Sequence, residues 1–150
     1  MVNKMSRRTA LIGAGLLSFA WSAPTFAAST SFEVALSGAK EVPAVDTSGK
    51  GTADITYDPA TRVVTWSITY EGLASPVTMA HFHAGAPGKN GPVQVWLTKK
   101  GEPVKSPITG SATLTSVQAQ QFLAGGWYVN LHTKDHPAGA IRGEVRPPKG

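Results

Sequence analysis

The sequence predicts an all-β fold, an antiparallel Greek-key β-sandwich of about seven to eight strands with one short helix. Three features of the 150-residue chain predict it: short runs in which apolar and polar residues alternate, turn-forming residues between these runs, and a single segment with a helical signature. Alternation with a period of two places apolar side chains on one face of a strand. Many short strands separated by turns are typical of a sandwich.

The first half of the mature chain predicts a strand followed by a hairpin. Residues 31–36 alternate between two faces, and residues 37–50 are rich in Gly, Pro and Ser, as in a loop. Residues 51–57 and 62–70 are rich in β-branched and aromatic residues and are joined by an Asp-Pro-Ala-Thr turn. Two β-rich runs with turn chemistry between them indicate a hairpin.

The second half predicts five more strands and the helix. Residues 115–123 form the only helical pattern, with Thr115 as N-cap, Gln118 completing a capping box and a Gly-Gly pair as the stop signal. The tryptophans in the strands are expected in the core: Trp66, Trp96 and Trp127. The further strands are predicted at residues 77–83, 93–97, 108–114, 127–132 and 140–145.

Residues 1–27 predict a cleaved export signal. Three basic residues precede the apolar run 10–20, and small residues precede the expected cleavage point after Ala27. The apolar run is too short for a spanning helix, although an uncleaved signal would be an N-terminal anchor. An Arg-Arg pair also resembles the twin-arginine signal. We therefore expect residues 28–150 to form a single domain, located in the periplasm or secreted.

The charge of the mature chain argues against a nucleic-acid partner. The formal charge of +5 falls to +2, because three of the 14 basic residues and none of the nine acidic residues lie in residues 1–27. The rest has no basic run, so neither nucleic acid nor, after signal cleavage, a membrane is an expected partner. Because the chain has no cysteine, it has neither disulfides nor thiolate ligands.

All four histidines lie in two segments. His81 and His83 are two residues apart in a predicted strand, which places both imidazoles on one face, and His132 and His136 follow about fifty residues later. This cluster predicts one mononuclear metal site. Imidazole suits iron or copper, and zinc is less favoured; Asp135 could add a carboxylate. In the alternative, the histidines are solvated or bond to backbone carbonyls.

Three polar residues share the expected face of the site. Tyr128 and Asn130 precede His132 by four and two residues on the same side of its strand, and Arg142 lies on the outward face of the last strand. In a catalytic role, Tyr128 would donate a proton or orient solvent and Arg142 would attract a small anion such as superoxide. In a structural role, Tyr128 would pack at a sheet edge and Arg142 would pair with Glu144 or Asp135.

The chain resembles the CHRD (chordin-type) domain family. The resemblance lies in residues 33–45, in the segment Ala80-His81-Phe82-His83 through Val93, and in residues 127–133 and 141–145. It covers nearly the whole mature chain. It implies a β-rich domain of an exported protein.

The order of the histidine motifs is also similar to that of Cu,Zn superoxide dismutases. His-x-His is followed by a Gly-rich loop, a later strand ending in His132, and an Ala-Gly-x-x-Arg-like segment at residues 138–142. This chain has no disulfide and no bridging histidine, so the similarity implies a mononuclear site. We expect a redox metalloenzyme of superoxide dismutase type. A periplasmic metal-binding or storage protein without turnover and a β-sandwich interaction module without metal stay open, as does a homo-oligomer.

Overall fold

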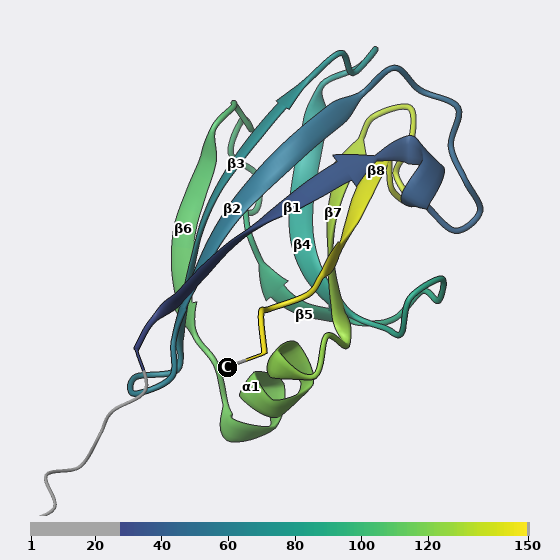
Figure 1. Cartoon of the computed structure of the whole chain (residues 1–150). Coiled ribbons are helices and arrows are strands. Elements are labelled where there is room, and N and C mark those ends of the chain that lie inside the picture. Colours follow the sequence, from purple (N-terminus) through teal and green to yellow (C-terminus); the bar gives the residue numbers. More distant parts are fainter. Residues whose placement is uncertain (1–27, 150) are drawn as a thin grey trace, which may run out of the picture.

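The computed structural model describes residues 28–149, and the predicted export signal lies outside this range. Figure 1 shows a β-fold with one short α-helix, as predicted. None of the helices in the described range is long and apolar enough to span a membrane. The elements in chain order are β1 (Thr30–Ser37), the 3-10 helix η1 (Gly38–Lys40), β2 (Lys50–Asp58), β3 (Val63–Glu71), β4 (Val77–Ala84), β5 (Val93–Trp96), β6 (Ile108–Thr113), α1 (Ser116–Leu123), β7 (Trp127–Thr133) and β8 (Ile141–Val145).

The strands form one antiparallel sheet that folds over on itself. Its order is β5-β4-β7-β8-β1-β2-β3-β6. The two halves meet where β8 pairs with β1, and there only Ser37 and Arg142 are in register. Figure 1 shows β6, β3, β2 and β1 on one side and β4, β7 and β8 on the other. The antiparallel all-β prediction is therefore confirmed.

The apolar core lies between these two halves. Trp66 of β3 meets Phe82 of β4 edge-to-face, with ring centroids 5.9 Å apart. Helix α1 contributes Phe122, which packs against Phe82 and against Trp127 of β7. The helix begins at Thr115 with the predicted capping box to Gln118. Trp66 and Trp127 thus lie in the core, as expected from the sequence.

Strand β7 is buried on both faces. All seven of its residues are buried; Trp127, Val129 and Leu131 belong to the core. The alternating residues Tyr128 and His132 face the opposite side with Asn130 between them, because side chains alternate across a strand. Loops cover that side, so the sheet carries a second buried layer that is polar.

Trp96 does not lie in the core, contrary to the sequence prediction. Strand β5 is an edge strand of four residues, and the Trp96 side chain is 46% exposed. Trp96 alternates with Val95 and Leu97, which pack on the core, so its side chain faces the opposite side of the sheet. Trp96 lies on the histidine side, where its ring stands perpendicular to that of His81 at 4.2 Å between centroids.

Candidate metal centre

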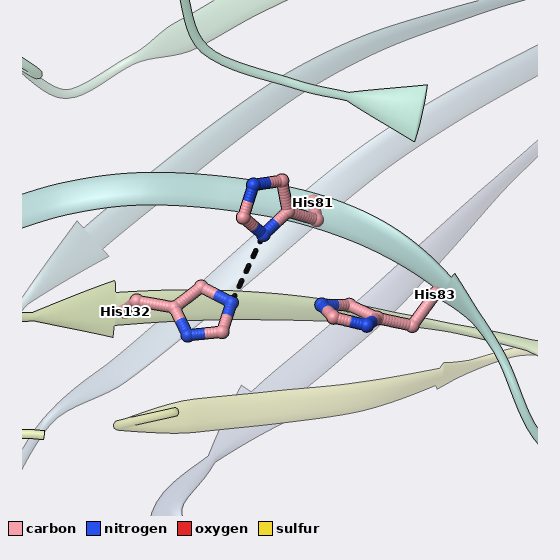
Figure 2. A group of neighbouring side chains, drawn as sticks. All are labelled: His81, His83 and His132. Atoms are coloured by element: carbon pink, nitrogen blue, oxygen red, sulfur yellow. Dashed lines mark hydrogen bonds between the residues drawn. The ribbon is translucent and has the colours of Figure 1, made fainter. Parts of the chain in front are cut away.

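Three of the four histidines converge in the polar layer (Figure 2). His81 and His83 come from β4 and His132 from β7, its antiparallel neighbour. One potential ligand atom from each lies within 4.8 Å of the other two. The side chains are 3%, 9% and 6% exposed, respectively. Phe82 points into the core between the first two, so the strand period itself directs both imidazoles to the opposite face.

The closest pair has the spacing of two ligands of one ion. His81 Nδ1 lies 3.1 Å from His132 Nε2, as the dashed line in Figure 2 marks. Imidazole nitrogens bind transition metals at about 2.0–2.1 Å, so adjacent ligands of a tetrahedral or octahedral ion lie about 2.9–3.4 Å apart. The distance between these two nitrogens therefore fits a shared ion.

Backbone carbonyls determine which ring nitrogens carry protons. His83 Nδ1 lies 2.9 Å from the Gly91 carbonyl oxygen, and His132 Nδ1 lies 3.0 Å from that of Pro137. A carbonyl only accepts, so both Nδ1 atoms are protonated and both Nε2 atoms carry lone pairs. His81 Nδ1 must then donate to His132 Nε2. As a result, the Nε2 atoms of His81 and His83 are buried acceptors, and neither has a partner among the described residues.

Burial keeps the three imidazoles neutral. Desolvation, together with the neighbouring His132 and His83, lowers the pKa of His81 from 6.5 to about 4. Desolvation likewise lowers the pKa of His83 and of His132, although backbone hydrogen bonds to Gly91 and Pro137 partly oppose it. Neutral imidazole is the form that binds metal, so the cluster is ready to coordinate at neutral pH.

Tyr128 supports His83 rather than standing free. Its ring stacks on that of His83, with centroids 5.0 Å apart and planes 6° apart. The Tyr128 hydroxyl accepts a hydrogen bond of 3.1 Å from the Gly91 N–H. Gly91 therefore holds the His83 imidazole through its carbonyl and the Tyr128 hydroxyl through its amide. Such outer contacts orient a ligating histidine.

Arg142 is fully buried behind Tyr128. Its Cζ lies 3.5 Å from the centre of the Tyr128 ring. Its Nε and Nη2 donate to Glu144 Oε1 at 3.0 and 2.8 Å. Its Nη1 donates to Asn90 Oδ1 at 3.1 Å and its Nη2 also to the Lys89 carbonyl at 2.9 Å. All three guanidinium nitrogens have partners. The pairing with Glu144 is the structural alternative considered from the sequence, and the contacts to residues 89–90 hold the loop that carries Gly91.

His136 lies outside the group of three. Its carbonyl accepts from the amides of Thr133 and Gly139 at 3.2 and 3.1 Å, and its own amide donates to Thr133 Oγ1 at 3.1 Å. Its side chain is half-buried and lines a small pocket beside Glu41, and Asp135 lines the same pocket. The structure thus brings together His81, His83 and His132 of the four predicted ligands.

One buried polar residue of this layer, Glu41, was missed from the sequence. Asn130 lies between Tyr128 and His132 on the same face of β7, as the strand period predicted. Glu41 lies in a segment rich in Gly, Pro and charged residues, which reads as a solvated loop. No local sequence signal indicates that its carboxyl is buried. Only the folding of its loop over β7 and β8 brings it there.

Comparison with known proteins places this architecture in a family. The family model described as the CHRD domain matches residues 32–145. The chain belongs to the CHRD domain family. The matched range includes β4, β7 and all four histidines, and it confirms the resemblance seen in the sequence. A search of curated proteins and a search of solved structures gave no match.

Proposed function

We propose that this CHRD-domain protein is an exported metal-binding protein that holds one iron or copper ion at His81, His83 and His132. One observation carries the proposal: the buried Nε2 atom of His83 has no partner among the described residues, and it lies beside His81 Nδ1 and His132 Nε2, which have the 3.1 Å spacing of adjacent ligands. Buried polar atoms are nearly always satisfied, so an unpartnered acceptor beside this histidine pair calls for an occupant.

The chemistry of the donor set supports a transition metal. With the tautomers set by Gly91 and Pro137, His83 Nε2 and His132 Nε2 are acceptors only, so a cation would satisfy them, with the proton of His81 moved from Nδ1 to Nε2. Imidazole favours iron and copper over calcium or magnesium, which prefer oxygen. The sequence has no cysteine, so a thiolate site of the structural zinc type is excluded.

We further propose that the protein acts as a redox enzyme of superoxide dismutase type. A bound iron or copper ion would supply one-electron exchange with superoxide; overall, two superoxide anions and two protons yield dioxygen and hydrogen peroxide. The neutral, histidine-only donor set and the order of the histidine motifs support this assignment. Tyr128 would hold the His83 ring in place, and Arg142 would fasten the loop behind Tyr128.

Metal binding without turnover is the second candidate. It is favoured by the engagement of Arg142, whose nitrogens already bind Glu144, Asn90 and Lys89 and so do not offer a free cation to an anionic substrate. The burial of all three imidazoles points the same way. In either case, the sequence of residues 1–27 supports function in the periplasm or outside the cell.

The metal content of the purified protein tests the site. Mature protein would be prepared from its native compartment without a His tag, and bound metals would be measured by mass spectrometry. We expect about one equivalent of iron or copper, retained in His136→Ala and lost in His81→Ala/His132→Ala. No metal in the wild type, and none after reconstitution, would contradict the proposal.

Superoxide turnover separates the two candidates. Metal-loaded wild type would be assayed beside the His81→Ala/His132→Ala protein carrying no bound metal. Turnover present only in the loaded wild type supports a dismutase. A full equivalent of metal without turnover leaves a metal-binding protein.

A further inference from the structure

A buried carboxyl group lies next to the candidate metal centre without belonging to the group of three histidines. Glu41 follows helix η1 and is only 7% exposed. Its Oε2 accepts a hydrogen bond of 3.4 Å from Asn130 Nδ2, and its Oε1 has no partner within residues 28–149. Since an unpaired buried carboxylate is costly, this group needs a proton or a compensating charge.

Gly139 closes the space around this carboxyl. A Cβ added there would come within 2.7 Å of both Glu41 oxygens and within 2.6 Å of Asn130 Nδ2. The backbone of Gly139, at φ 140°, is in a region that favours glycine. The close approach of the 134–140 loop therefore depends on the absence of a side chain at this position.

Asn130 places Glu41 one side chain away from the histidines. On β7 it lies between Tyr128 and His132, and across the sheet it is in register with His81 on β4 and with Arg142 on β8. Residues directly opposite on antiparallel strands have Cβ atoms about 4.5–5.5 Å apart. The Asn130 Oδ1 atom is also buried and has no partner in the described part of the chain.

On its other side, Glu41 lines a pocket. The pocket lies between the segment 41–45 and the segment 135–139, and Asp135 and His136 line it as well. Because Asp135 is exposed and His136 is half-buried, the pocket gives the carboxyl a route to solvent. Glu41 thus stands between a solvent-accessible pocket and the polar layer that holds the histidines.

The charges of the polar layer affect whether Glu41 is protonated. Burial raises the pKa of Glu41 from 4.5 to about 7, while Arg142 and the Asn130 hydrogen bond oppose the rise. Arg142 is already neutralised by Glu144, and Asp135 and His136 face the carboxyl only across the pocket. A divalent ion on three neutral imidazoles would add two positive charges to this layer. Ionisation of Glu41 would offset one of them.

We propose that Glu41 is the proton-exchanging acid of the histidine site: it releases a proton through the pocket beside His136 when positive charge enters the His81–His83–His132 cluster, and takes one up when that charge falls. This inference rests on the proposed metal site. In a dismutase, which consumes protons, it would make Glu41 a local proton store. Asn130 is the positioning residue between the acid and the cluster.

Proton release on binding Zn²⁺, a redox-inert probe, tests the inference. Wild type would be titrated with zinc chloride by calorimetry at pH 7 in buffers of different ionisation enthalpy. The three histidines are already neutral at this pH, so they contribute little. We expect the wild type to release about half a proton more per zinc ion than Glu41→Gln. Glu33→Gln, which alters an exposed glutamate of β1, should match the wild type.

An infrared measurement on the wild type provides a check that needs no variant. The carbonyl band of a buried protonated carboxyl should be present in the metal-free protein at pH 6 and should weaken when zinc is added. If zinc binds with the same proton release in wild type and Glu41→Gln, or with an unchanged carboxyl band, the role of Glu41 is overturned and the metal site is not. No zinc bound by the wild type overturns the metal site and this inference together.

Discussion

The side chain of Arg142 stabilises the fold, because it makes more hydrogen bonds than any other side chain of the polar layer. It is completely buried, and its guanidinium bonds Glu144, Asn90 Oδ1 and the Lys89 carbonyl while stacking on Tyr128. Replacement by methionine keeps much of the volume but leaves Glu144 without its partner and two loop acceptors unsatisfied. Removing one partner of a buried ion pair costs about 3–5 kcal/mol, so we expect Arg142→Met to lower the free energy of unfolding by that amount.

Arg142→Lys separates charge from geometry. The ammonium keeps the charge, but it cannot bridge three acceptors in a plane or stack as guanidinium does, so a loss of about 1–3 kcal/mol is expected. Metal-free protein would be unfolded in urea, with tryptophan fluorescence as the signal, so that metal binding does not contribute to the stability. Arg146→Met, which alters an exposed arginine just after β8, is the matched control.

Arg142→Met should also weaken the metal site. The contacts to Lys89 and Asn90 hold the loop whose Gly91 orients the His83 ring. Loss of such an outer contact typically lowers metal affinity by about 10–100-fold. An Arg142→Met protein as stable as Arg146→Met, with unchanged zinc affinity, would refute the supporting role argued for this arginine.

Three further outcomes follow from the same contacts. Tyr128→Phe keeps the stack on His83 but deprives the Gly91 N–H of its acceptor, so the free energy of unfolding should fall by about 1–3 kcal/mol in urea titrations. Because the pKa of Glu41 is raised to about 7, the folded state holds more protons than the unfolded state between pH 4.5 and 7. As the pH rises from 4.5 to 7, the free energy of unfolding of metal-free wild type relative to Glu41→Gln should therefore fall by about 3 kcal/mol. A difference that does not change with pH contradicts the burial of this carboxyl. Because the pKa of His81 is lowered to about 4, bound zinc should be retained at pH 6 and released near pH 4. Metal analysis after dialysis at each pH measures the zinc that stays bound. Release already at pH 6 would indicate an ordinary, solvated imidazole.

Local patterns determined much of this fold in advance. The apolar alternation in β2, β3, β7 and β8, the turn between β2 and β3 and the capping box at Thr115 each depend on residues close together in the chain. Their structural preferences follow from side-chain periodicity and backbone sterics, which act over a few residues. For the same reason, the pairing of His81 with His83 on one face could be predicted.

Contacts between distant segments were decided only by the tertiary structure. The register that sets His81 beside Asn130 joins residues about fifty positions apart, and no local pattern specifies it. Trp96 became an exposed neighbour of His81 because its strand is at the sheet edge. His136 separated from the other histidines because its loop turns back on Thr133.

The sequence by itself determined the strand pattern, the CHRD family resemblance and the two histidine segments, because each depends on residues that are close together in the chain. The tertiary structure decided which three histidines meet, that Arg142 is buried on Glu144, and that Glu41 lies beside Asn130. Those outcomes depend on how the loops at 38–49, 85–92 and 134–140 fold over β7. The physical reason is burial: a carboxyl, a guanidinium and an imidazole change their chemistry when water is removed, and only the assembled fold removes it.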